Sequence, residues 1–339
     1  MQSKTPNKVR WGILGTSRFA TGRMIPAIQG SQRGTAVAIA SRSIDKARAT
    51  ASRFAIARMY GSYDELLADG EIDAIYIPLP NHLHVPWSIR AMEAGKHVLC
   101  EKPIATSAAE AEQLLAARKR TGRLVVEAAM VRAHPRWFGA RALVREGRIG
   151  ELRAMNGFFS FFNDSPDNVR NQPGIGGGGL LDIGFYPITM SRFIFEAEPV
   201  RVLGLLDMDA RFGVDRMASA ILEFARGHAT FTCSMQLVPH QALDIFGTRG
   251  RIEIEIPWSM PDDRDSRLVL HRGTQEAVEE VRFAACNQWR LLCDRFAEAI
   301  QGGVGVGAEV PVPIEDSIAN MRVIDALFRS SHSGRWESP

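Results

Sequence analysis

The first 130 residues alternate short apolar segments with helical segments, and this alternation constrains the fold more than any other feature. Gly or a polar residue closes most of these segments, and the apolar ones lie at 9–15, 35–40, 74–77, 97–100 and 124–126. Strands and helices that alternate in this way predict a right-handed, mostly parallel, doubly wound sheet. We therefore expect an α/β domain over residues 1–130.

The first apolar segment runs into a turn with the pattern of a dinucleotide fingerprint. Residues 15–20 read GTSRFA, so serine and alanine replace the second and third glycines of G-x-G-x-x-G. These glycines make the turn, let the backbone approach a pyrophosphate and let the helix pack on the strand. Small side chains also suit these positions, and helix-terminal N–H groups would face the phosphates. The turn predicts a Rossmann domain whose cofactor contacts include Gly15, Thr16, Ser17, Arg18 and Phe19.

The end of the second strand indicates which dinucleotide is bound. An NAD-binding domain usually has Asp or Glu here for the ribose 2′-hydroxyl, whereas this chain continues as Ser41-Arg42-Ser43. The Arg42 guanidinium can bind a 2′-phosphate through two nitrogens, with Lys46 one turn along as a second cation. Ser41, Arg42 and Lys46 therefore favour NADP, with NAD as the alternative.

The strand at 97–100 ends in an acid, an amine and a proline. Ligands in open α/β sheets bind outside the carboxyl ends of the strands, so Glu101 and Lys102 are expected to face a ligand. Pro103 allows the Lys102–Pro103 peptide bond to be cis. The alternative is a surface lysine at a strand end. The preceding strand leads into a loop at the same edge, and the cofactor contacts predicted there are Pro80, Asn81 and His84.

The second half of the chain, residues 131–339, has a different pattern. A helix near 135–146 is followed by strand patterns without intervening helices, near 200–206, 217–225, 229–238, 242–246 and 251–256. This order predicts an α+β domain with an open, mainly antiparallel sheet. Helices near 286–301 and 315–330 finish the chain, and the last of them could return to the first domain.

A run of four glycines at 176–179 precedes the segment Leu180-Leu181-Asp182-Ile183-Gly184-Phe185-Tyr186. Flexible backbone of this kind lets a helix start close to a ligand or to another backbone. Asp182 and Tyr186 are four residues apart and share a helical face. Pro187 fits only a first helical turn, so both side chains should lie at the helix entrance. An ordinary capping aspartate with a half-buried tyrosine is the alternative.

Composition excludes several classes of function. Lys and Arg total 41 against 38 Asp and Glu, a net charge of +3 without a long basic run, so a nucleic-acid partner is not expected. No apolar run is long enough for a membrane span, and the polar start shows no secretory signal. The four cysteines are scattered without zinc-ligand spacing, so we expect buried thiols, no metal site and a cytoplasmic location.

The turn at Gly15, the Glu101-Lys102-Pro103 motif and the glycine run leading to Tyr186, in this order, resemble the glucose-fructose oxidoreductase, inositol dehydrogenase and MocA-like family. Many members carry histidine at the position of Tyr186. Tyrosine there, with Asn168-Val169-Arg170 before the glycines, is most similar to the D-xylose dehydrogenase and dimeric dihydrodiol dehydrogenase branch. Ser17 departs from the common glycine and leaves the affinity for the cofactor open. The Ala128-Ala129-Met130 segment, near the expected sugar pocket, departs from a more aromatic pattern and leaves the substrate open.

The resemblance implies a Rossmann domain, a second domain whose open sheet forms a dimer interface, and a homodimer or higher homo-oligomer. It also implies NADP-dependent hydride transfer to or from a sugar or cyclic polyol, with D-xylose-like aldose oxidation favoured. A trans-dihydrodiol dehydrogenase and a keto-sugar reductase are the alternatives. The direction of the reaction stays open, and a sensor of sugar or cofactor without catalysis is the hypothesis from another class.

The catalytic residues implied are Lys102, Tyr186 and Asp182. A tyrosine hydroxyl has an ordinary pKa of about 10 and is a poor base at neutral pH. A neighbouring Lys102 ammonium would favour the phenolate, while Asp182 would orient Lys102 or a sugar hydroxyl. His82 and His84 are the alternative bases. The residues predicted to hold the remaining substrate hydroxyls are Asn168, Arg170 and Arg132.

Overall fold

The structure is a computed structural model that describes residues 8–273, 277–302 and 310–339. The chain divides into two compact units. One unit comprises the chain up to residue 105 with 109–133 and 287–318, and the other comprises 106–108, 134–286 and 319–339. Each unit contains one sheet, and the two are described separately.

The first unit alternates strands and helices, as the sequence predicts. In the element labels, η marks a short 3₁₀- or π-helical segment. Its elements are β1 (Val9–Leu14), η1 (Ala20–Met24), α1 (Ile25–Gln29), β2 (Gly34–Ala40), α2 (Ile44–Phe54), β3 (Arg58–Tyr60), α3 (Tyr63–Leu67), β4 (Ala74–Ile77), η2 (Asn81–Leu83), α4 (His84–Glu93), β5 (His97–Cys100), α5 (Ala108–Thr121), β6 (Val125–Glu127), η3 (Met130–Ala133) and α8 (Gln288–Gln301). Helix α9 (Ile314–Ser333) starts in this unit and ends in the other.

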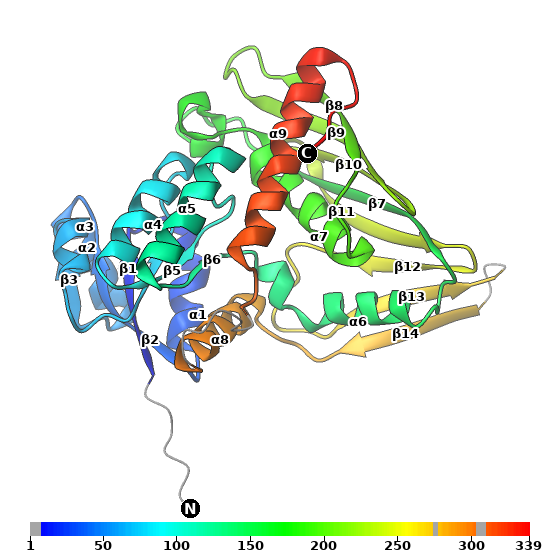
Figure 1. The fold of residues 1–339 in the computed structure, drawn as a ribbon. Helices are drawn as coiled ribbons and strands as arrows, with labels where there is room; N and C mark the ends of the chain where they lie inside the picture. The colour runs from blue at the N-terminus through cyan, green and yellow to red at the C-terminus, as the bar shows by residue number, and fades with distance from the viewer. Residues whose placement is uncertain (1–7, 274–276, 303–309) are drawn as a thin grey trace, which may run out of the picture. The chain divides into compact units, whose positions relative to one another are not determined.

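The strands of the first unit form a parallel sheet in the order β3-β2-β1-β4-β5-β6 (Figure 1). β4 and β5 are buried at every position, as expected of central strands covered on both faces. The strand order reverses between β1 and β4, which is where an open α/β sheet binds its ligand. This doubly wound sheet confirms the predicted fold of the first half.

Helix α8 follows the second sheet in sequence but packs on the first. The ring of Phe296 lies 5.5 Å from that of Trp11 in β1, and Arg33 forms an ion pair with Glu298. Ser31 also donates a hydrogen bond to Asp294. The two units therefore do not correspond to a single cut of the chain at residue 130. The sequence pattern of an amphipathic helix does not specify which sheet its apolar face will cover.

The second unit begins with a helix and continues mainly as strands. Its elements are α6 (Pro135–Arg145), β7 (Leu152–Phe162), η4 (Val169–Asn171), η5 (Pro173–Ile175), η6 (Leu180–Gly184), α7 (Phe185–Phe195), β8 (Arg201–Met208), β9 (Asp215–Phe224), β10 (Gly227–Ser234), β11 (Gln236–Gly247), β12 (Gly250–Glu255), β13 (Ser266–Arg272) and β14 (Ala277–Phe283). Among the described helices of the whole chain, none has an apolar stretch that could cross a bilayer.

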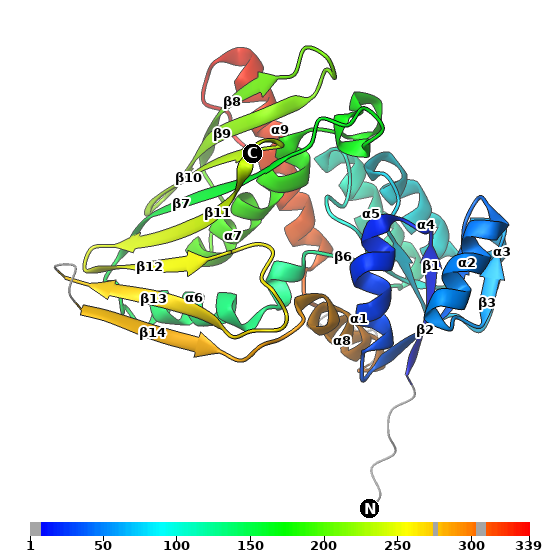
Figure 2. The ribbon, with the colours of Figure 1, turned by 180° about the vertical axis from the view of Figure 1, so that it is seen from behind.

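The strands of the second unit form one sheet in the order β14-β13-β12-β11-β7-β10-β9-β8, antiparallel except for the β7–β10 pair. Helices α6 and α7 and the later part of α9 lie over one face, and no described helix covers the other face (Figures 1 and 2). This open sheet confirms the predicted α+β class. β13 and β14 were not predicted; in β14, Glu279, Glu280 and Arg282 give the charged pattern of an edge strand.

The glycine run packs against a buried carboxyl group in β9. The Leu180 N–H donates a 2.6 Å hydrogen bond to Oδ2 of Asp215, which is 2% exposed. Gly178 has a φ of +114°, and a Cβ at this position would lie 2.1 Å from Oδ1 of Asp215. Burial raises the pKa of Asp215 to about 7. The absence of a side chain at Gly178 therefore lets β9 hold the start of the helix that carries Asp182.

We expect the substitution Gly178→Ala to lower the free energy of unfolding by about 2–4 kcal/mol, because it adds left-handed strain and a clash with Asp215. Urea unfolding measures this change. Gly174→Ala is the matched control, because nothing lies within 4 Å of a Cβ there. Equal stabilities for the two variants would show that the close approach to Asp215 does not constrain this turn.

Candidate active site

A cavity of about 510 Å³ lies at the carboxyl ends of β1, β2 and β4, in the first unit. This is the edge of the sheet at which doubly wound folds bind nucleotides. The cavity collects residues from four separate segments of the chain, which are Gly15, Thr16, Ser17, Ser41, Arg42, Ser43, Lys46, Tyr63, Pro78, Leu79 and Pro80. Seven of the residues predicted to bind cofactor therefore line one cavity.

The turn after β1 has the backbone that a pyrophosphate cradle requires. Gly15 has a φ of +115°, which side chains rarely adopt, and a Cβ there would lie 3.3 Å from Leu79 Cδ2. The Ser17 hydroxyl accepts a 3.1 Å hydrogen bond from the Ala20 N–H, as a capping residue does. Serine at this position thus stabilises the helix start without closing the cavity. These residues fit the phosphates of a dinucleotide.

Arg42 lies at the mouth of the cavity, where its side chain is exposed. The half-buried Tyr63 lines the same cavity as Arg42, and the Tyr63 ring packs edge-on against Trp87 at 4.9 Å. Burial raises the pKa of Tyr63, while the Arg42 cation opposes that rise. The sequence pattern did not identify Tyr63, because a tyrosine after a capping serine has no fixed partner until the strand ends are brought together.

The strand end that carries Lys102 lies next to β4 in the same sheet. Tyr76, which is fully buried, donates a 2.7 Å hydrogen bond to Oε1 of Glu101, and Oε2 of Glu101 accepts one of 3.3 Å from the Lys102 N–H. The Lys102–Pro103 bond is cis. Glu101 is thus held on both sides by the protein, and the backbone direction after β5 is well defined.

The other residues predicted for the cofactor do not line this cavity. Arg18 and Phe19 are exposed at the start of the first helix, and Asn81 begins η2. His84 is fully buried, with Nδ1 2.7 Å from the Pro103 carbonyl oxygen and Nε2 2.7 Å from that of Leu79. Their cofactor contacts remain predictions, and the burial of His84 gives that side chain a different set of partners.

Two residues predicted to hold substrate lie beside Asp182 in the second unit. Nε of Arg170 forms a 2.6 Å ion pair with Oδ2 of Asp182. The Asn168 side chain accepts a 3.0 Å hydrogen bond from the Arg170 N–H and so caps η4. Arg132 lies in the first unit instead, where it forms a 2.9 Å ion pair with Asp316. The ion pair with Arg170 gives Asp182 a cationic partner within its own unit.

Tyr186 lies in an aromatic environment within the second unit. Its ring centroid is 5.7 Å from Phe159, 5.5 Å from Phe185 and 5.9 Å from Trp258. The side chain is 5% exposed. Aromatic walls of this kind restrict the rotation of the ring and limit the access of water to it. Trp258 belongs to a segment for which the sequence pattern indicated no role.

Buried acids are the main functional candidates that sequence reasoning missed. Glu127 ends β6 and is 1% exposed, and its Oε1 accepts a 2.7 Å hydrogen bond from the Ile104 N–H. Burial raises the pKa of Glu127 to about 7, although the Ile104 hydrogen bond and the Lys102 charge oppose that rise. The sequence signal that could have identified Glu127 was its position directly after the apolar residues Val125 and Val126.

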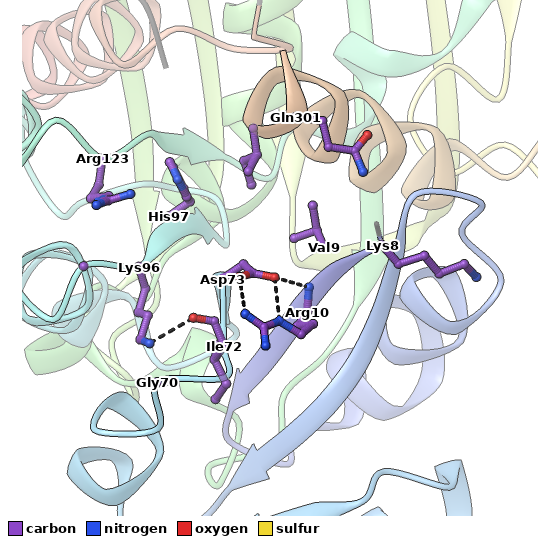
Figure 3. Close-up of a pocket in the computed structure, with 12 residues that line it drawn as sticks. Lys8, Val9, Arg10, Gly70, Ile72, Asp73, Lys96, His97, Arg123 and Gln301 are labelled. Atoms are coloured by element: carbon purple, nitrogen blue, oxygen red, sulfur yellow. Dashed lines mark hydrogen bonds and ion pairs between the residues drawn. The ribbon is translucent and has the colours of Figure 1, made fainter. Parts of the chain in front are cut away.

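A second cavity, of about 750 Å³, lies at the amino ends of β1 and β5 and contains several cations (Figure 3). Arg10 is bound there by Asp73 through bonds of 2.8 to 3.0 Å, and the Lys96 ammonium donates to the Ile72 carbonyl at 2.9 Å. These cations are engaged by protein acceptors. The cavity at the carboxyl ends is therefore the candidate cofactor site.

Comparison with known proteins agrees with this geometry. Residues 9–128 match the model of the oxidoreductase family with an NAD-binding Rossmann fold, and residues 139–253 match the GFO/IDH/MocA C-terminal domain. An uncharacterised oxidoreductase of Rhizobium meliloti is 47% identical over 97% of this chain and 99% of its own length. The NADP-dependent D-xylose 1-dehydrogenase 2 of Haloferax volcanii is 35% identical over 96% of this chain and 98% of its own.

A solved 3-ketoreductase from Actinomadura kijaniata, in complex with NADP and TDP-benzene, has a TM-score of 0.88 and 30% identity. The match covers 96% of this chain and 98% of the ketoreductase. Both units thus have counterparts in one family, which confirms the resemblance drawn from the motifs. The chain belongs to the GFO/IDH/MocA oxidoreductase family, with its NAD-binding Rossmann domain and its C-terminal domain.

Proposed function

We propose that this protein is an NADP-dependent oxidoreductase that transfers hydride between the cofactor and a sugar or cyclic polyol. Oxidation of an aldose, as in D-xylose dehydrogenases, is the favoured reaction. The observation that carries the proposal is similarity over nearly the whole chain to an NADP-dependent D-xylose 1-dehydrogenase, together with a cavity of matching chemistry. Incubation of the purified protein with NADP and a panel of aldoses, followed by NADPH absorbance, tests it directly.

The residues of the cavity support NADP as the cofactor. Gly15 and Ser17 would hold the pyrophosphate through the backbone, while Arg42 and Lys46 supply the positive charge that a 2′-phosphate needs. Among the described residues that line the cavity, none is an Asp or Glu of the kind that an NAD-binding domain places there for the ribose. When bound, the cofactor supplies the acceptor for a hydride, and the protein supplies orientation and proton transfer.

In the proposed mechanism, the Tyr186 hydroxyl exchanges a proton with the reacting hydroxyl of the substrate. Lys102 binds the same oxygen and, through its charge, favours the phenolate form of Tyr186. Asp182, paired with Arg170 in the second unit, orients a substrate hydroxyl or Lys102. Asn168 and Arg170 bind further hydroxyls, and Arg132 is assigned to the same task from the first unit. The homodimer and the cytoplasmic location stay predictions.

A keto-sugar reductase is the second candidate, supported by the 3-ketoreductase that this fold matches at a TM-score of 0.88. The two activities use the same residues in opposite directions, so product analysis distinguishes them. An aldose dehydrogenase consumes NADP and releases a lactone, whereas a reductase consumes NADPH only when a keto sugar is present. A trans-dihydrodiol dehydrogenase would oxidise a cyclic diol instead, and a sensor would bind sugar or cofactor without any absorbance change.

Replacing Lys102 with Met or Tyr186 with Phe removes a proton-transfer group, so we expect kcat to fall about 10²–10⁴-fold in each variant. Steady-state NADPH absorbance with the best aldose measures the change. Lys119→Met, at an exposed position on α5, is the control and should leave kcat unchanged. Near-normal turnover of both active-site variants would exclude this assignment.

Arg42→Ala should raise the KM for NADP about 10–100-fold while leaving the KM for NAD nearly constant, because a charge-assisted hydrogen bond to phosphate is lost. Binding of 2′,5′-ADP, compared with that of 5′-AMP, measures the same preference without turnover. Arg48→Ala removes an exposed cation of α2 that pairs with Asp45 and does not line the cavity, and it serves as the control. An equal rise in the KM values for NADP and for NAD would contradict the role of Arg42.

A further inference from the structure

The segment after Lys102 is held by buried side chains that come from two other elements of the first unit. His84, at the first position of α4, lies with Nδ1 2.7 Å from the Pro103 carbonyl oxygen. Glu127, at the last position of β6, accepts the Ile104 N–H at 2.7 Å. Both side chains are at most 1% exposed. The carbonyl and the N–H of the Pro103–Ile104 peptide group are therefore bound by side chains from two different elements, α4 and β6.

The same histidine also reaches the wall of the cofactor cavity. Its Nε2 lies 2.7 Å from the carbonyl oxygen of Leu79, and Leu79 lines that cavity. One imidazole ring is thus in contact with the Pro78–Pro80 loop and with the Lys102 segment. A change in the position of either loop must move or release this ring, because a fully buried side chain has little free space around it.

The protonation of His84 follows from its surroundings. Burial lowers its pKa to about 4, so at neutral pH the ring has a single N–H. The Pro103 carbonyl contact is buried, whereas the Leu79 contact is only partly buried and its oxygen can be solvated. An unsatisfied buried carbonyl costs more free energy than one that reaches water. The proton of the neutral ring is therefore assigned to Nδ1, which donates to the Pro103 carbonyl, and Nε2 then lies beside the Leu79 carbonyl oxygen without a hydrogen bond to it.

We infer that His84 and Glu127 are positioning residues for Lys102, which fix the Pro103 carbonyl and the Ile104 N–H so that the Lys102 side chain leaves the backbone at a constant place beside the cofactor cavity. This inference rests on the proposed function, in which Lys102 binds the reacting oxygen. It assigns to His84 a role other than direct cofactor contact or general base. Neither side chain needs to touch the substrate, because each acts through the backbone.

Substitution by asparagine or by glutamine at position 84 tests the two contacts of the imidazole ring one at a time. The amide of Asn occupies the place of Nδ1, and the amide of Gln the place of Nε2. His84→Asn should therefore keep the donor to Pro103, whereas His84→Gln should lose it. We expect kcat to be about tenfold or more lower for His84→Gln than for His84→Asn, because small displacements of a catalytic group are costly. The KM for NADP should change less than kcat in both variants.

Glutamine and leucine at position 127 provide an independent comparison. Glu127→Gln keeps an oxygen that can accept the Ile104 N–H, and Glu127→Leu removes it at similar volume. We expect a larger loss of kcat for the leucine variant, with partial rescue by glutamine. His332→Gln, an exposed residue of α9, is the control for substitution of a histidine. Circular dichroism at the assay temperature confirms that each variant is folded, so that a change in kcat is not a change in folded fraction.

Amide hydrogen exchange of Ile104 in the cofactor-free protein supplies a readout that does not depend on turnover. Loss of the Glu127 acceptor or of the His84 donor should make this amide exchange about tenfold faster or more. The inference is overturned if Ile104 exchanges as in the parent protein in His84→Gln and Glu127→Leu, or if it exchanges faster while kcat stays normal. Near-normal turnover by the Lys102→Met variant would instead refute the proposed function. The exchange rate of the Ile104 amide would then still show whether His84 and Glu127 hold the segment after Lys102.

Discussion

The pairing of parallel strands is the constraint on which the rest of the first unit depends. Parallel hydrogen bonding in the order β3-β2-β1-β4-β5-β6 brings every strand end of this sheet to one edge. The turn at Gly15, the Ser41–Lys46 segment, the Pro78–Pro80 loop and Lys102 are far apart in sequence. They meet because each follows a strand of the same sheet, and three of these four segments line one cavity. The position of the candidate cofactor site thus follows from backbone geometry before any side chain is considered.

Buried polar groups give that edge its shape. Tyr76 holds Glu101, Glu127 holds the Ile104 N–H, and in the second unit Asp215 holds the Leu180 N–H. Each of these groups is costly to bury unless it is hydrogen-bonded, so each specifies one backbone conformation over its alternatives. The same principle applies to both units, where the segment after Lys102 and the helix start that carries Asp182 are each held by a buried carboxyl group. Preorganisation of this kind is what hydride and proton transfer require of a protein.

Prediction succeeded where a local pattern is sufficient and failed where partners are remote. The alternating segments of the first half, the G-x-S-x-x-A turn and the helix start near Asp182 were all identified from neighbouring residues. β14 was missed because a charged edge strand has a weak apolar signal, whereas β13 was missed although it contains the apolar run Leu268-Val269-Leu270. Tyr63 was missed because its partner Arg42 is 21 residues earlier, in another βα connection. His84 was predicted at the cofactor, and that contact stays a prediction; no sequence pattern indicated that both ring nitrogens lie beside backbone carbonyl oxygens.

By itself, the sequence determined the α/β and α+β classes, the family and the identity of Lys102 and Tyr186 as candidates, because motifs and periodicities are local properties of a chain. Tertiary contacts alone account for the place of Tyr63 in one cavity with Arg42, for the packing of α8 on the first sheet and for the burial of Asp215 and Glu127 as hydrogen-bond acceptors. These features depend on which residues meet after the strands pair. Their spacing in the chain leaves no periodic signal, and burial, which raises the pKa of both carboxyl groups to about 7, exists only in the folded protein.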